Sequence, residues 1–507
     1  MGERATSPAR RKFLRAGTLA AAAAAFSGAP HAPAAEPRRW DDEADLLVMG
    51  SGGAGVSAAL EARSRGAEVR VYEMLPIPGG SSCLSGGVCY MGGGTPLQKA
   101  LGFEDSREDM YRFMVAASGR YAALAKIEVY CNESLAHFDW LVANGVKYAQ
   151  RFSPEKELSH EAASLYFCGN ERAYPYRDIA RPAPRGHVPP AKNQTGGRSL
   201  MQSLLASLQQ HGVQVITGAS CERLVLASDG TVLGVEVRDA RGMRAVRARK
   251  GVVLAAGGFI HNPQMLKQHA PELFACSPHW GRAGDLGIGI RMGMSIGANV
   301  LHMRQGFAVL PLYPPENVLK GVVVNLRGQR CVSEDSYYGV VGHELLFNQG
   351  GRGYLIVDRA SDYAAPDYRL VVAAEAPSIA ALEARLALPQ QSLQQTVAYY
   401  NRYAERGEDP LLRKAHDYLA PLSAPPFKAY DLSIEQAFYA VHTFGGLETT
   451  VNAEVLNVEG EVIPGLYAAG RTSAGIPVAP YYASGLSIGD STFFGRRAAM
   501  HAVARRA

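Results

Sequence analysis

Asp45-Leu-Leu-Val-Met-Gly-Ser-Gly-Gly-Ala-Gly55 is the stretch that decides the fold of this chain. Its apolar first half predicts a buried strand, and the glycine turn that follows leads into a helical segment to about Arg65. A second strand, Ala67–Tyr72, ends at Glu73. A strand, a Gly-x-Gly-x-x-Gly turn, a helix, a second strand and an acid, in this order, are typical of a dinucleotide-binding unit.

The glycines of this turn have distinct physical roles. The first two allow the tight turn and the approach of the backbone to a pyrophosphate, and the third allows the helix to pack against the strand. The carboxylate after the second strand is expected to accept a hydrogen bond from a ribose hydroxyl. The unit therefore predicts these cofactor-binding residues: Gly50, Gly52, Gly53, Ala54, Gly55, Glu73 and Met74.

A second glycine-rich run, Gly79-Gly-Ser-Ser-Cys-Leu-Ser-Gly-Gly87, follows soon after the acid. Glycine pairs on both sides of serines suit a loop that wraps a diphosphate and the edge of a flavin, and the alternative is a mobile loop without a ligand. The position of the run directly after the dinucleotide unit favours the cofactor. The predicted contacts are Gly79, Gly80, Ser81, Ser85, Gly86 and Gly87.

Later segments are expected to return to the same sheet. A helix from Gly196 to about Gln210, a strand at Gln214–Thr217 and a hairpin over Arg223–Arg238 lead into Gly251–Gly258. This last run predicts a buried parallel strand with a glycine stop. Its predicted cofactor contacts are Ala256, Gly257 and Gly258.

The C-terminal region predicts a strand, a loop and a helix beside the cofactor. A hairpin over Glu454–Pro464 leads into Gly465-Leu-Tyr-Ala-Ala-Gly-Arg471, and the loop Pro480-Tyr-Tyr-Ala-Ser-Gly-Leu-Ser-Ile488 opens a helix. A helix start offers unpaired backbone N–H groups and the positive end of the helix dipole, which can hold the electron-rich end of a flavin. The predicted contacts are Gly470, Arg471, Ser487 and Ile488.

Composition excludes some classes of function. The chain has 507 residues, 47% of them hydrophobic and 20% charged, which is typical of a globular protein with more than one domain. Its net charge is +5, but residues 1–34 hold five basic side chains and one acid, so the remainder is close to neutral and no nucleic-acid partner is expected. The seven cysteines include no C-x-x-C pair, and no metal site is expected.

The N-terminus predicts an export signal. Ala9-Arg-Arg-Lys-Phe-Leu-Arg15 is close to the twin-arginine pattern, an apolar alanine-rich run follows to Phe26, and Ala32-Pro-Ala34 suits cleavage. We expect residues 1–34 to send the folded protein to the periplasm; the alternative is a disordered alanine-rich tail. No apolar run elsewhere reaches the roughly 18 residues of a transmembrane helix, so no stable membrane span is expected.

Residues 271–434 break the pattern of the flanking segments. They combine helical segments with short strands at Gly321–Leu326 and Leu355–Asp358, and a polar helix is expected near Ser392–Glu405. We interpret this region as an inserted domain. In the preceding part of the chain, residues 172–195 are rich in Pro, Arg and Gly and predict a long surface loop.

Three of these motifs together resemble the flavoprotein superfamily of fumarate reductase and the 3-ketosteroid dehydrogenases. They are Glu73 after the glycine turn, Leu254-Ala-Ala-Gly-Gly258 and Ile463-Pro-Gly-Leu-Tyr-Ala-Ala-Gly470. The resemblance covers residues 44–500 and implies noncovalent FAD, because Gly79–Gly87 holds no histidine for a covalent bond. It implies an α/β fold, with a glutathione-reductase-like FAD-binding domain over 40–270 and 435–507 and an inserted α+β capping domain over 271–434.

Two positions separate the chemistries within this superfamily. Fumarate reductases carry a proton-donating arginine shortly after a strand end that Arg330-Cys-Val-Ser-Glu334 resembles, and Tyr338 stands at that position in this chain. Their carboxylate-binding arginine corresponds to Tyr481. A dicarboxylate needs charged partners in a desolvated site, so two phenols argue against fumarate as the substrate.

The 3-ketosteroid dehydrogenases carry tyrosines at both positions. The resemblance implies that Tyr481 and the N–H of Gly485 hold the ketone oxygen, and that Tyr338 takes the proton next to the ketone while a hydride passes to flavin N5. A tyrosine with an ordinary pKa of about 10 is a weak base, so its phenolate needs support from Tyr337, a basic side chain or the flavin. The neighbouring phenols Tyr337 and Tyr482 are the remaining catalytic candidates.

His442 stands where fumarate reductases keep a histidine on the substrate side, and a structural hydrogen bond and a role in the site both stay open. Ser484 is expected either to cap the helix that follows or to lie beside the substrate.

Shorter runs are similar to the branch that oxidises 5α-3-ketosteroids at C4–C5: Gly92-Gly-Gly-Thr-Pro96, Pro184-Arg-Gly-His187 and Glu334-Asp-Ser-Tyr-Tyr338. The resemblance thus implies FAD-dependent dehydrogenation of a small apolar ketone of the steroid class. The expected external electron acceptor is a quinone or a carrier protein. A 3-ketosteroid 1-dehydrogenase, an exported enone or enoate reductase of the fumarate reductase type and a non-catalytic electron carrier stay open as alternatives.

Overall fold

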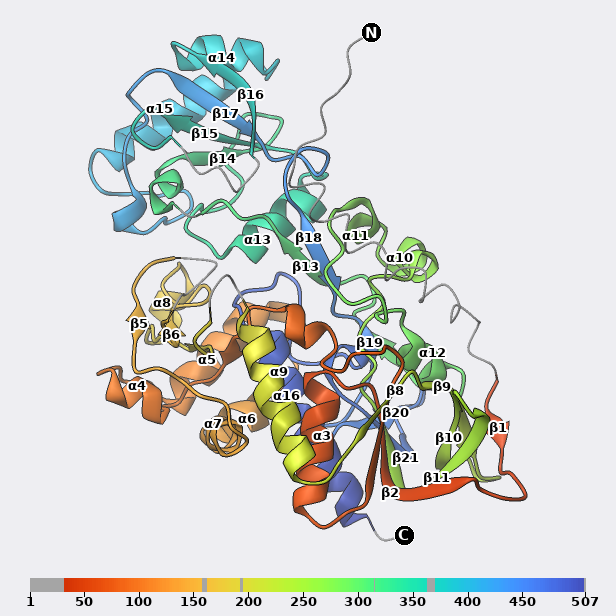
Figure 1. The fold of residues 1–507 in the computed structure, drawn as a ribbon. Helices are drawn as coiled ribbons and strands as arrows, with labels where there is room; N and C mark the ends of the chain where they lie inside the picture. Colours follow the sequence, from red (N-terminus) through yellow and green to blue (C-terminus); the bar gives the residue numbers. More distant parts are fainter. Residues whose placement is uncertain (1–31, 157–161, 192–194, 314, 363–369, 506–507) are drawn as a thin grey trace.

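The computed structural model describes residues 32–156, 162–191, 195–313, 315–362 and 370–505. Two parts are joined by a narrower region that contains β13 (Gly306–Val309) and β18 (Ala440–Thr443) (Figure 1). The twin-arginine motif and the alanine-rich run of the predicted signal peptide lie outside the described residues.

A nine-stranded mixed sheet lies at the centre of the larger part. β2 (Asp42–Met49) is in its middle. β3 (Val69–Glu73) and β8 (Val215–Thr217) follow in parallel on one side, and β11 (Gly242–Leu254) and β21 (Val462–Ala468) lie in parallel on the other. The strands predicted from the glycine motifs are therefore confirmed, and they meet with their carboxyl ends at one edge of the sheet.

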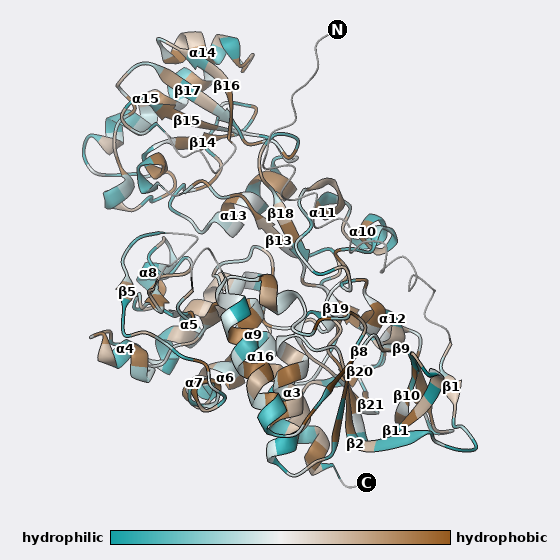
Figure 2. Cartoon of the chain, in the orientation of Figure 1, coloured by the Kyte–Doolittle hydropathy of each residue, from teal (hydrophilic) through white to brown (hydrophobic). Residues whose placement is uncertain are grey.

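The alternation of side chains along β2 explains why its second half, Leu46–Met49, is apolar without interruption. Leu46 and Val48 pack in the cluster that includes residues of α3 (Gly53–Ser64) and α16 (Leu486–Ala504). The intervening side chain of Leu47 packs in a second cluster on the opposite face. Both faces of this strand are buried, as expected for parallel strands with cover on each side. Hydrophobic residues accordingly colour strands of the sheet brown (Figure 2).

The antiparallel elements of the sheet lie at its margins. β9 (Ser220–Leu226) and β10 (Val232–Asp239) form the predicted hairpin, and β10 continues onto the first half of β11. β20 (Glu454–Leu456) pairs with β21, which confirms the second predicted hairpin. β1 (Ala34–Ala35) adds a short parallel strand to β9.

A helical lobe packs beside α16. It contains α5 (Arg107–Ser118), α6 (Leu124–Asn132), α7 (Ser134–Ala143) and α9 (Gly196–Gln210). The smaller elements of the lobe are α4 (Pro96–Ala100), α8 (Tyr176–Ile179) and a four-stranded sheet of β4 (Cys89–Tyr90), β7 (Gly186–His187), β6 (Leu165–Tyr166) and β5 (Phe152–Ser153).

The surface loop predicted over residues 172–195 is wrong in its central part. Arg185 is fully buried, and its guanidinium donates to the buried carboxylate of Asp105 at 2.7 Å. His187 is also buried and lies in β7, where Thr95 bonds its ring. Arg181 of the same run is exposed, so only the central residues are buried, where a distant carboxylate compensates the charge of Arg185.

The smaller part is the inserted region. Its sheet has the order β14 (Val322–Val324), β15 (Tyr354–Asp358), β17 (Phe427–Asp431) and β16 (Val371–Ala376), and all its neighbouring strands are antiparallel. α14 (Ile379–Arg385) and α15 (Ser392–Ala404) pack on this sheet (Figure 1). The remaining elements of the chain include α10 (Pro263–His269), α11 (Pro271–Ala275), α12 (Ile288–Met294), β12 (Val300–Leu301), α13 (Tyr338–His343) and β19 (Gly446–Leu447).

In the part of the chain that the structure describes, no helix is both long and apolar enough to cross a membrane. The domain boundaries at 270 and 434 stay a prediction. Arg282, Gly284, Asp285 and Ile288, which follow the first boundary, line the same cleft as the dinucleotide motif.

Candidate active site

A cleft of about 770 Å³ lies at the carboxyl ends of the parallel strands. Its lining joins the β2–α3 turn, the end of β3, the end of β11 and the residues after β21. The predicted cofactor residues that line it are Gly50, Gly52, Gly53, Ala54, Glu73, Met74, Gly80, Ser81, Ala256, Gly257, Gly470 and Arg471. Segments that are hundreds of residues apart in sequence therefore form one site.

Gly50 shows why the turn needs glycine. Its φ is +99°, a conformation that L side chains rarely adopt, and an added Cβ would lie 2.4 Å from the carbonyl oxygen of Ala255. Gly55 has a different task, because a Cβ there would lie 2.0 Å from the oxygen of Gly50. Gly55 thus lets α3 start directly against the turn, and it does not itself line the cleft.

The Glu73 carboxylate is held at the end of β3. Its Oε2 accepts from the N–H and the hydroxyl of Ser51, at 3.0 and 2.5 Å, and its Oε1 accepts from the N–H of Leu75 at 2.9 Å. The acid is 7% exposed and lines the cleft, in the position expected for a ribose partner. The role of Ser51 as the residue that orients this acid was not predicted from the sequence.

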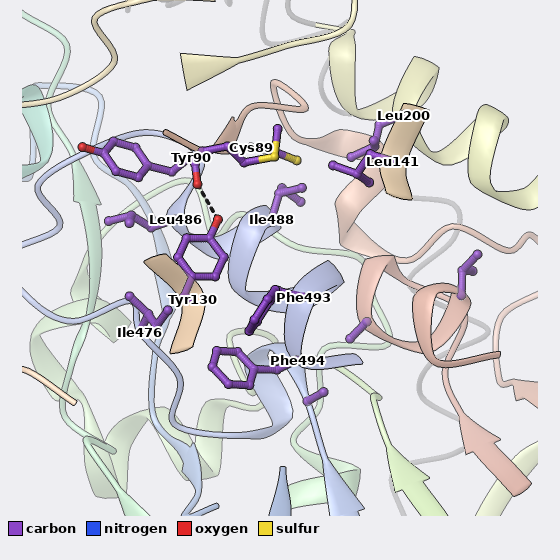
Figure 3. Close-up of a cluster of buried hydrophobic side chains, with 14 of the residues drawn as sticks. Cys89, Tyr90, Tyr130, Leu141, Leu200, Ile476, Leu486, Ile488, Phe493 and Phe494 are labelled. Atoms are coloured by element: carbon purple, nitrogen blue, oxygen red, sulfur yellow. Dashed lines mark hydrogen bonds between the residues drawn. The ribbon is translucent and has the colours of Figure 1, made fainter. Parts of the chain in front are cut away.

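Several predicted cofactor residues lie outside the cleft lining. An added Cβ on Gly87 would lie 2.1 Å from Gly196, so this part of the glycine-rich run packs against the start of α9. Ile488 is 8% exposed and lies in the hydrophobic cluster with Leu486 and Phe493 (Figure 3). The predicted residues that do not line the main cleft are Gly55, Gly79, Ser85, Gly86, Gly87, Gly258, Ser487 and Ile488. Their direct contact with a cofactor stays a prediction.

Asp285 links the two sides of the cleft. Its Oδ2 accepts from the hydroxyl of Ser81 at 2.7 Å and from the guanidinium of Arg471 at 2.6 Å. An added Cβ on Gly257 would lie 2.1 Å from Oδ1 of the same carboxylate. The sequence offered no signal for Asp285, because its importance depends on three segments that meet only in the fold.

A second hollow of about 230 Å³ continues from the main cleft through Gly470, Arg471 and Ser491, which line both. Ser487 and Asp490, on the first turns of α16, lie on its wall. The predicted helix start is confirmed, with Gly485 as the N-cap residue at φ +93°.

The neighbouring tyrosines Tyr337 and Tyr338 both lie within hydrogen-bond distance of Ser484. The Ser484 hydroxyl lies 2.7 Å from the hydroxyl of Tyr337 and 3.0 Å from that of Tyr338. Burial raises the pKa of both phenols, and for Tyr338 the hydrogen bonds from Ser484 and Tyr337 oppose this rise. Ser484 therefore does more than precede a helix, since it bridges the inserted region to the loop before α16.

Tyr481 is held by the first turn of α16. Its hydroxyl oxygen accepts from the N–H of Ser487 at 2.9 Å, and its O–H donates to the Ser487 hydroxyl at 3.1 Å. Burial raises the pKa of Tyr481, and both contacts with Ser487 oppose this rise. The N–H of Ser487 donates to the phenol in this structure, and its contact with the flavin stays a prediction. No hydrogen bond to another described residue engages the N–H of Gly485.

Tyr482 faces the opposite way. Its ring is fully buried against Phe113, with 5.7 Å between ring centroids, and its hydroxyl accepts from Ser118 at 3.3 Å. Adjacent residues of an extended segment point to opposite sides, so only Tyr481 joins the tyrosine group. Tyr482 is thus packed in the helical lobe, and its catalytic role stays a prediction without a contact that supports it.

Aromatic rings surround the tyrosine group. The Phe307 ring centroid lies 4.6 Å from that of Tyr481, 6.1 Å from that of Tyr337 and 6.0 Å from that of Tyr338. His442 lies 5.2 Å from the same ring, and burial followed by the charge of Arg471 places its pKa well below the usual range. The buried Nε2 of this histidine has no hydrogen-bond partner among the residues that the structure describes. The surroundings are therefore apolar, with a neutral imidazole.

A buried ion cluster positions the tyrosine pair. Arg330 donates to Glu334 at 2.6 Å and to Asp409 at 2.9 Å, and Lys414 lies 2.9 Å from Glu334. These four side chains are at most 2% exposed. The chain continues from this cluster to Tyr337, whose backbone N–H donates to Oδ1 of Asn170 at 2.6 Å. Arg330 forms a single antiparallel bridge with Val324, and a turn begins at Glu334.

Comparison with known proteins assigns the family. The FAD binding domain family matches residues 45–485. The chain belongs to this family of FAD-binding flavoproteins. It is an FAD-dependent oxidoreductase, and the predicted resemblance to the ketosteroid dehydrogenase and fumarate reductase flavoproteins is confirmed.

A 3-oxo-5-alpha-steroid 4-dehydrogenase from Comamonas testosteroni is 31% identical to this chain over 510 residues. The match covers 86% of this chain and 94% of that protein. The crystal structure of 3-ketosteroid-Δ4-(5α)-dehydrogenase from Rhodococcus jostii, in complex with 4-androstene-3,17-dione, matches with a TM-score of 0.88 and 41% identity, and the match covers 94% of this chain and 100% of that one. The 3-ketosteroid Δ1-dehydrogenase of Sterolibacterium denitrificans shares the fold, with a TM-score of 0.71 at 22% identity, over 92% of this chain and 100% of that chain.

The residues of the cleft fit FAD. The turn at Gly50 has no room for a side chain, the positive N-terminal end of α3 lies beside it, and the Glu73 carboxylate lies at the end of β3. These features suit the diphosphate and the adenosine ribose, and the second hollow provides space beyond them. The glutathione-reductase-like subclass and the noncovalent attachment stay predictions.

Proposed function

We propose that this flavoprotein dehydrogenates a 3-ketosteroid at the bond next to the ketone, with C4–C5 of 5α-3-ketosteroids as the favoured position. The observation that carries the proposal is the group of Tyr337, Tyr338 and Tyr481 around Ser484 and the start of α16. Among the described residues, no lysine or arginine side chain bonds these phenols. Such a site suits a ketone in an apolar molecule better than a carboxylate.

Tyr481 and Gly485 provide the groups that polarise the ketone. The phenol accepts the N–H of Ser487 at the positive end of a 19-residue helix, which makes its own O–H a stronger donor. The O–H can turn from Ser487 to a ketone oxygen, and the N–H of Gly485 is the second donor. Two donors aimed at a developing negative charge form an oxyanion-hole-type site, in which one donor contributes about 100-fold or more in rate.

Tyr338 is the proposed base, and Tyr337 and Ser484 support it. A phenol with a raised pKa is mostly protonated at neutral pH, so its neighbours must stabilise the deprotonated form. The hydrogen bonds from Ser484 and Tyr337 act in this direction. When bound, FAD supplies the acceptor for the hydride. Tyr482 has a packing role in this proposal.

The relatives support the choice of substrate class and of the C4–C5 bond. The curated and the solved relatives of highest identity described above are named for the 4-dehydrogenation of 5α-3-ketosteroids, and the match to the solved one covers its whole length. The protein named for the Δ1 reaction shares the fold at lower identity. We further propose that electrons leave to a quinone or a carrier protein.

Anaerobic reduction of the flavin tests this function. A 5α-3-ketosteroid is expected to bleach the FAD absorbance and to yield a product with a new C4–C5 double bond. Absence of bleaching with every 3-ketosteroid, or a product with only a C1–C2 double bond, contradicts the proposal. Tyr338→Phe is expected to abolish turnover with FAD still bound, and a fully active variant would rule out the base.

We also propose that the chain is exported to the periplasm by the twin-arginine route. The motif at residues 9–15 and the small residues at 32–34 support this. Replacement of Arg10 and Arg11 by lysine is expected to retain the enzyme in the cytoplasmic fraction, whereas unchanged periplasmic activity would contradict the proposal.

A further inference from the structure

Asp490 is a buried carboxylate on the wall of the second hollow. It lies on the same face of α16 as Ser487 and Ser491, and it is 3% exposed. Its Oδ1 accepts from the N–H of Ile476 at 2.8 Å. No described residue donates a hydrogen bond to its Oδ2. The side chain lines the hollow, so this oxygen is available to a group bound there.

The backbone around Asp490 fixes the direction of the carboxylate. An added Cβ on Gly475 would lie 2.3 Å from Oδ1 and 2.5 Å from Oδ2, so only glycine leaves room for the carboxylate at this point. The N–H of Ile476 then holds one oxygen from the same segment. The backbone therefore fixes the carboxylate of Asp490 in the wall of the hollow.

Lys126 is the charged partner of this carboxylate. Its amine comes from α6, and the side chain is 8% exposed. Nζ donates to Thr449 at 2.8 Å and to the carbonyl of Ala474 at 2.7 Å, which are both neutral acceptors. The charges that act on this amine are those of Asp490 and Glu448.

Burial lowers the pKa of Lys126 to about 8, against the opposing effect of Asp490 and Glu448. Burial also raises the pKa of Asp490 to about 6, against the hydrogen bond from Ile476 and the charge of Lys126. The other charged side chain of the hollow, Arg471, is paired with Asp285. Asp490 can therefore change its charge within the range in which proteins remain folded.

The hollow beside Asp490 lies beyond the part of the cleft that suits the diphosphate and the ribose. The N-terminus of α3 and Glu73 take the diphosphate and the ribose, which leaves the ring system for the continuation of the cleft past Arg471. We propose that Asp490 contacts the flavin ring of bound FAD and that Lys126 acts as its positioning residue, so that this pair sets the reduction potential of the cofactor in a pH-dependent way.

The physical reason is the charge that reduction adds to the ring. An ionised carboxylate in a buried site opposes added negative charge more strongly than it would in water. A protonated carboxyl group removes that opposition and can donate a hydrogen bond. Two-electron reduction above pH 6 is therefore coupled to the uptake of one solvent proton by Asp490, in addition to any taken up by the flavin. This inference rests on the FAD cofactor alone and not on the steroid substrate.

Anaerobic redox titration of the FAD-loaded enzyme tests the proposal, with dithionite as reductant and a dye of known potential. Asp490→Asn is expected to shift the ratio of reduced to oxidised flavin at least tenfold toward reduced at about pH 8, which is about 30 mV for a two-electron couple. At about pH 5, where Asp490 of the wild type is protonated, the two proteins should agree within about threefold. Thr492→Val, on the same helix but outside the lining of both the cleft and the hollow, is the control and should follow the wild type.

Lys126→Met provides an independent arm. The plot of reduction potential against pH changes slope near the pKa of Asp490. Loss of the amine should move this change of slope to a higher pH. It should also make the effect of Asp490→Asn at about pH 8 smaller. If Asp490→Asn fails to retain FAD, the redox titration of Lys126→Met tests the proposal in its place. The proposal would be overturned if the reduction potentials of Asp490→Asn and the wild type are equal or differ by the same amount at every pH. It would also be overturned if the change of slope in Lys126→Met stays at the wild-type pH.

Discussion

The Ser484→Ala substitution tests whether the tyrosine group works as a unit. It removes the hydroxyl that lies 2.7 Å from the hydroxyl of Tyr337 and 3.0 Å from that of Tyr338. A hydrogen bond of this kind contributes about 1 kcal/mol net. If both bonds support the base in the transition state, about 2 kcal/mol is lost, which corresponds to about a 30-fold fall in the rate of the chemical step.

The assay is stopped-flow reduction of the flavin by a 5α-3-ketosteroid under anaerobic conditions, followed across pH. The proposed base works in its deprotonated form, so the rate should rise with pH toward the raised pKa of Tyr338. Ser484 opposes the rise of this pKa, and its removal should therefore move the ascending limb to higher pH. The largest fall in rate is expected at neutral pH.

Ser118→Ala is the matched control. It also removes a serine hydroxyl from a buried tyrosine, but that tyrosine is Tyr482, which packs in the helical lobe. We expect a change in rate of less than about threefold and no change in the pH profile, because this bond supports packing and no reacting group. Equal rates for the Ser484 and Ser118 variants, or identical pH profiles, would refute the reasoning.

The other predictions use the same structure. Tyr481→Phe should lower the rate of flavin reduction about 100-fold, whereas Tyr482→Phe should leave it within about threefold; equal losses would contradict the opposite orientations. Gly50→Ala should yield protein that purifies with little FAD, because its Cβ would lie 2.4 Å from the oxygen of Ala255, and full FAD content would be inconsistent with that turn. Burial opposes ionisation of Glu334, but its cationic partners place the pKa at about 2, below the ordinary 4.5. Its contribution is present above pH 4.5 and should fall by about 3 kcal/mol of unfolding free energy as pH falls toward 2, which denaturant titration of the wild type and of Glu334→Gln can measure.

The sequence-based predictions that failed did so for physical reasons. Residues 172–195 look like a surface loop because their composition is polar, yet Arg185 is buried by an ion pair with Asp105, which comes 80 positions earlier. Asp285 and Asp490 carry no local motif, because each gains its role from segments that approach it only in the folded chain. The region after residue 270 contributes to the cleft for the same reason.

The sequence by itself determined the dinucleotide unit, since the spacing of Gly50, the following glycines and Glu73 encodes a local geometry that needs no distant partner. The resemblance also predicted that two phenols, Tyr338 and Tyr481, stand where fumarate reductases keep arginines. Only the tertiary structure decided which tyrosines work together. Ser484 joins Tyr337 and Tyr338 across 146 positions or more, and the start of α16 turns Tyr481 toward them and Tyr482 away. Such contacts depend on the packing of two separate parts of the chain, which no local pattern of residues records.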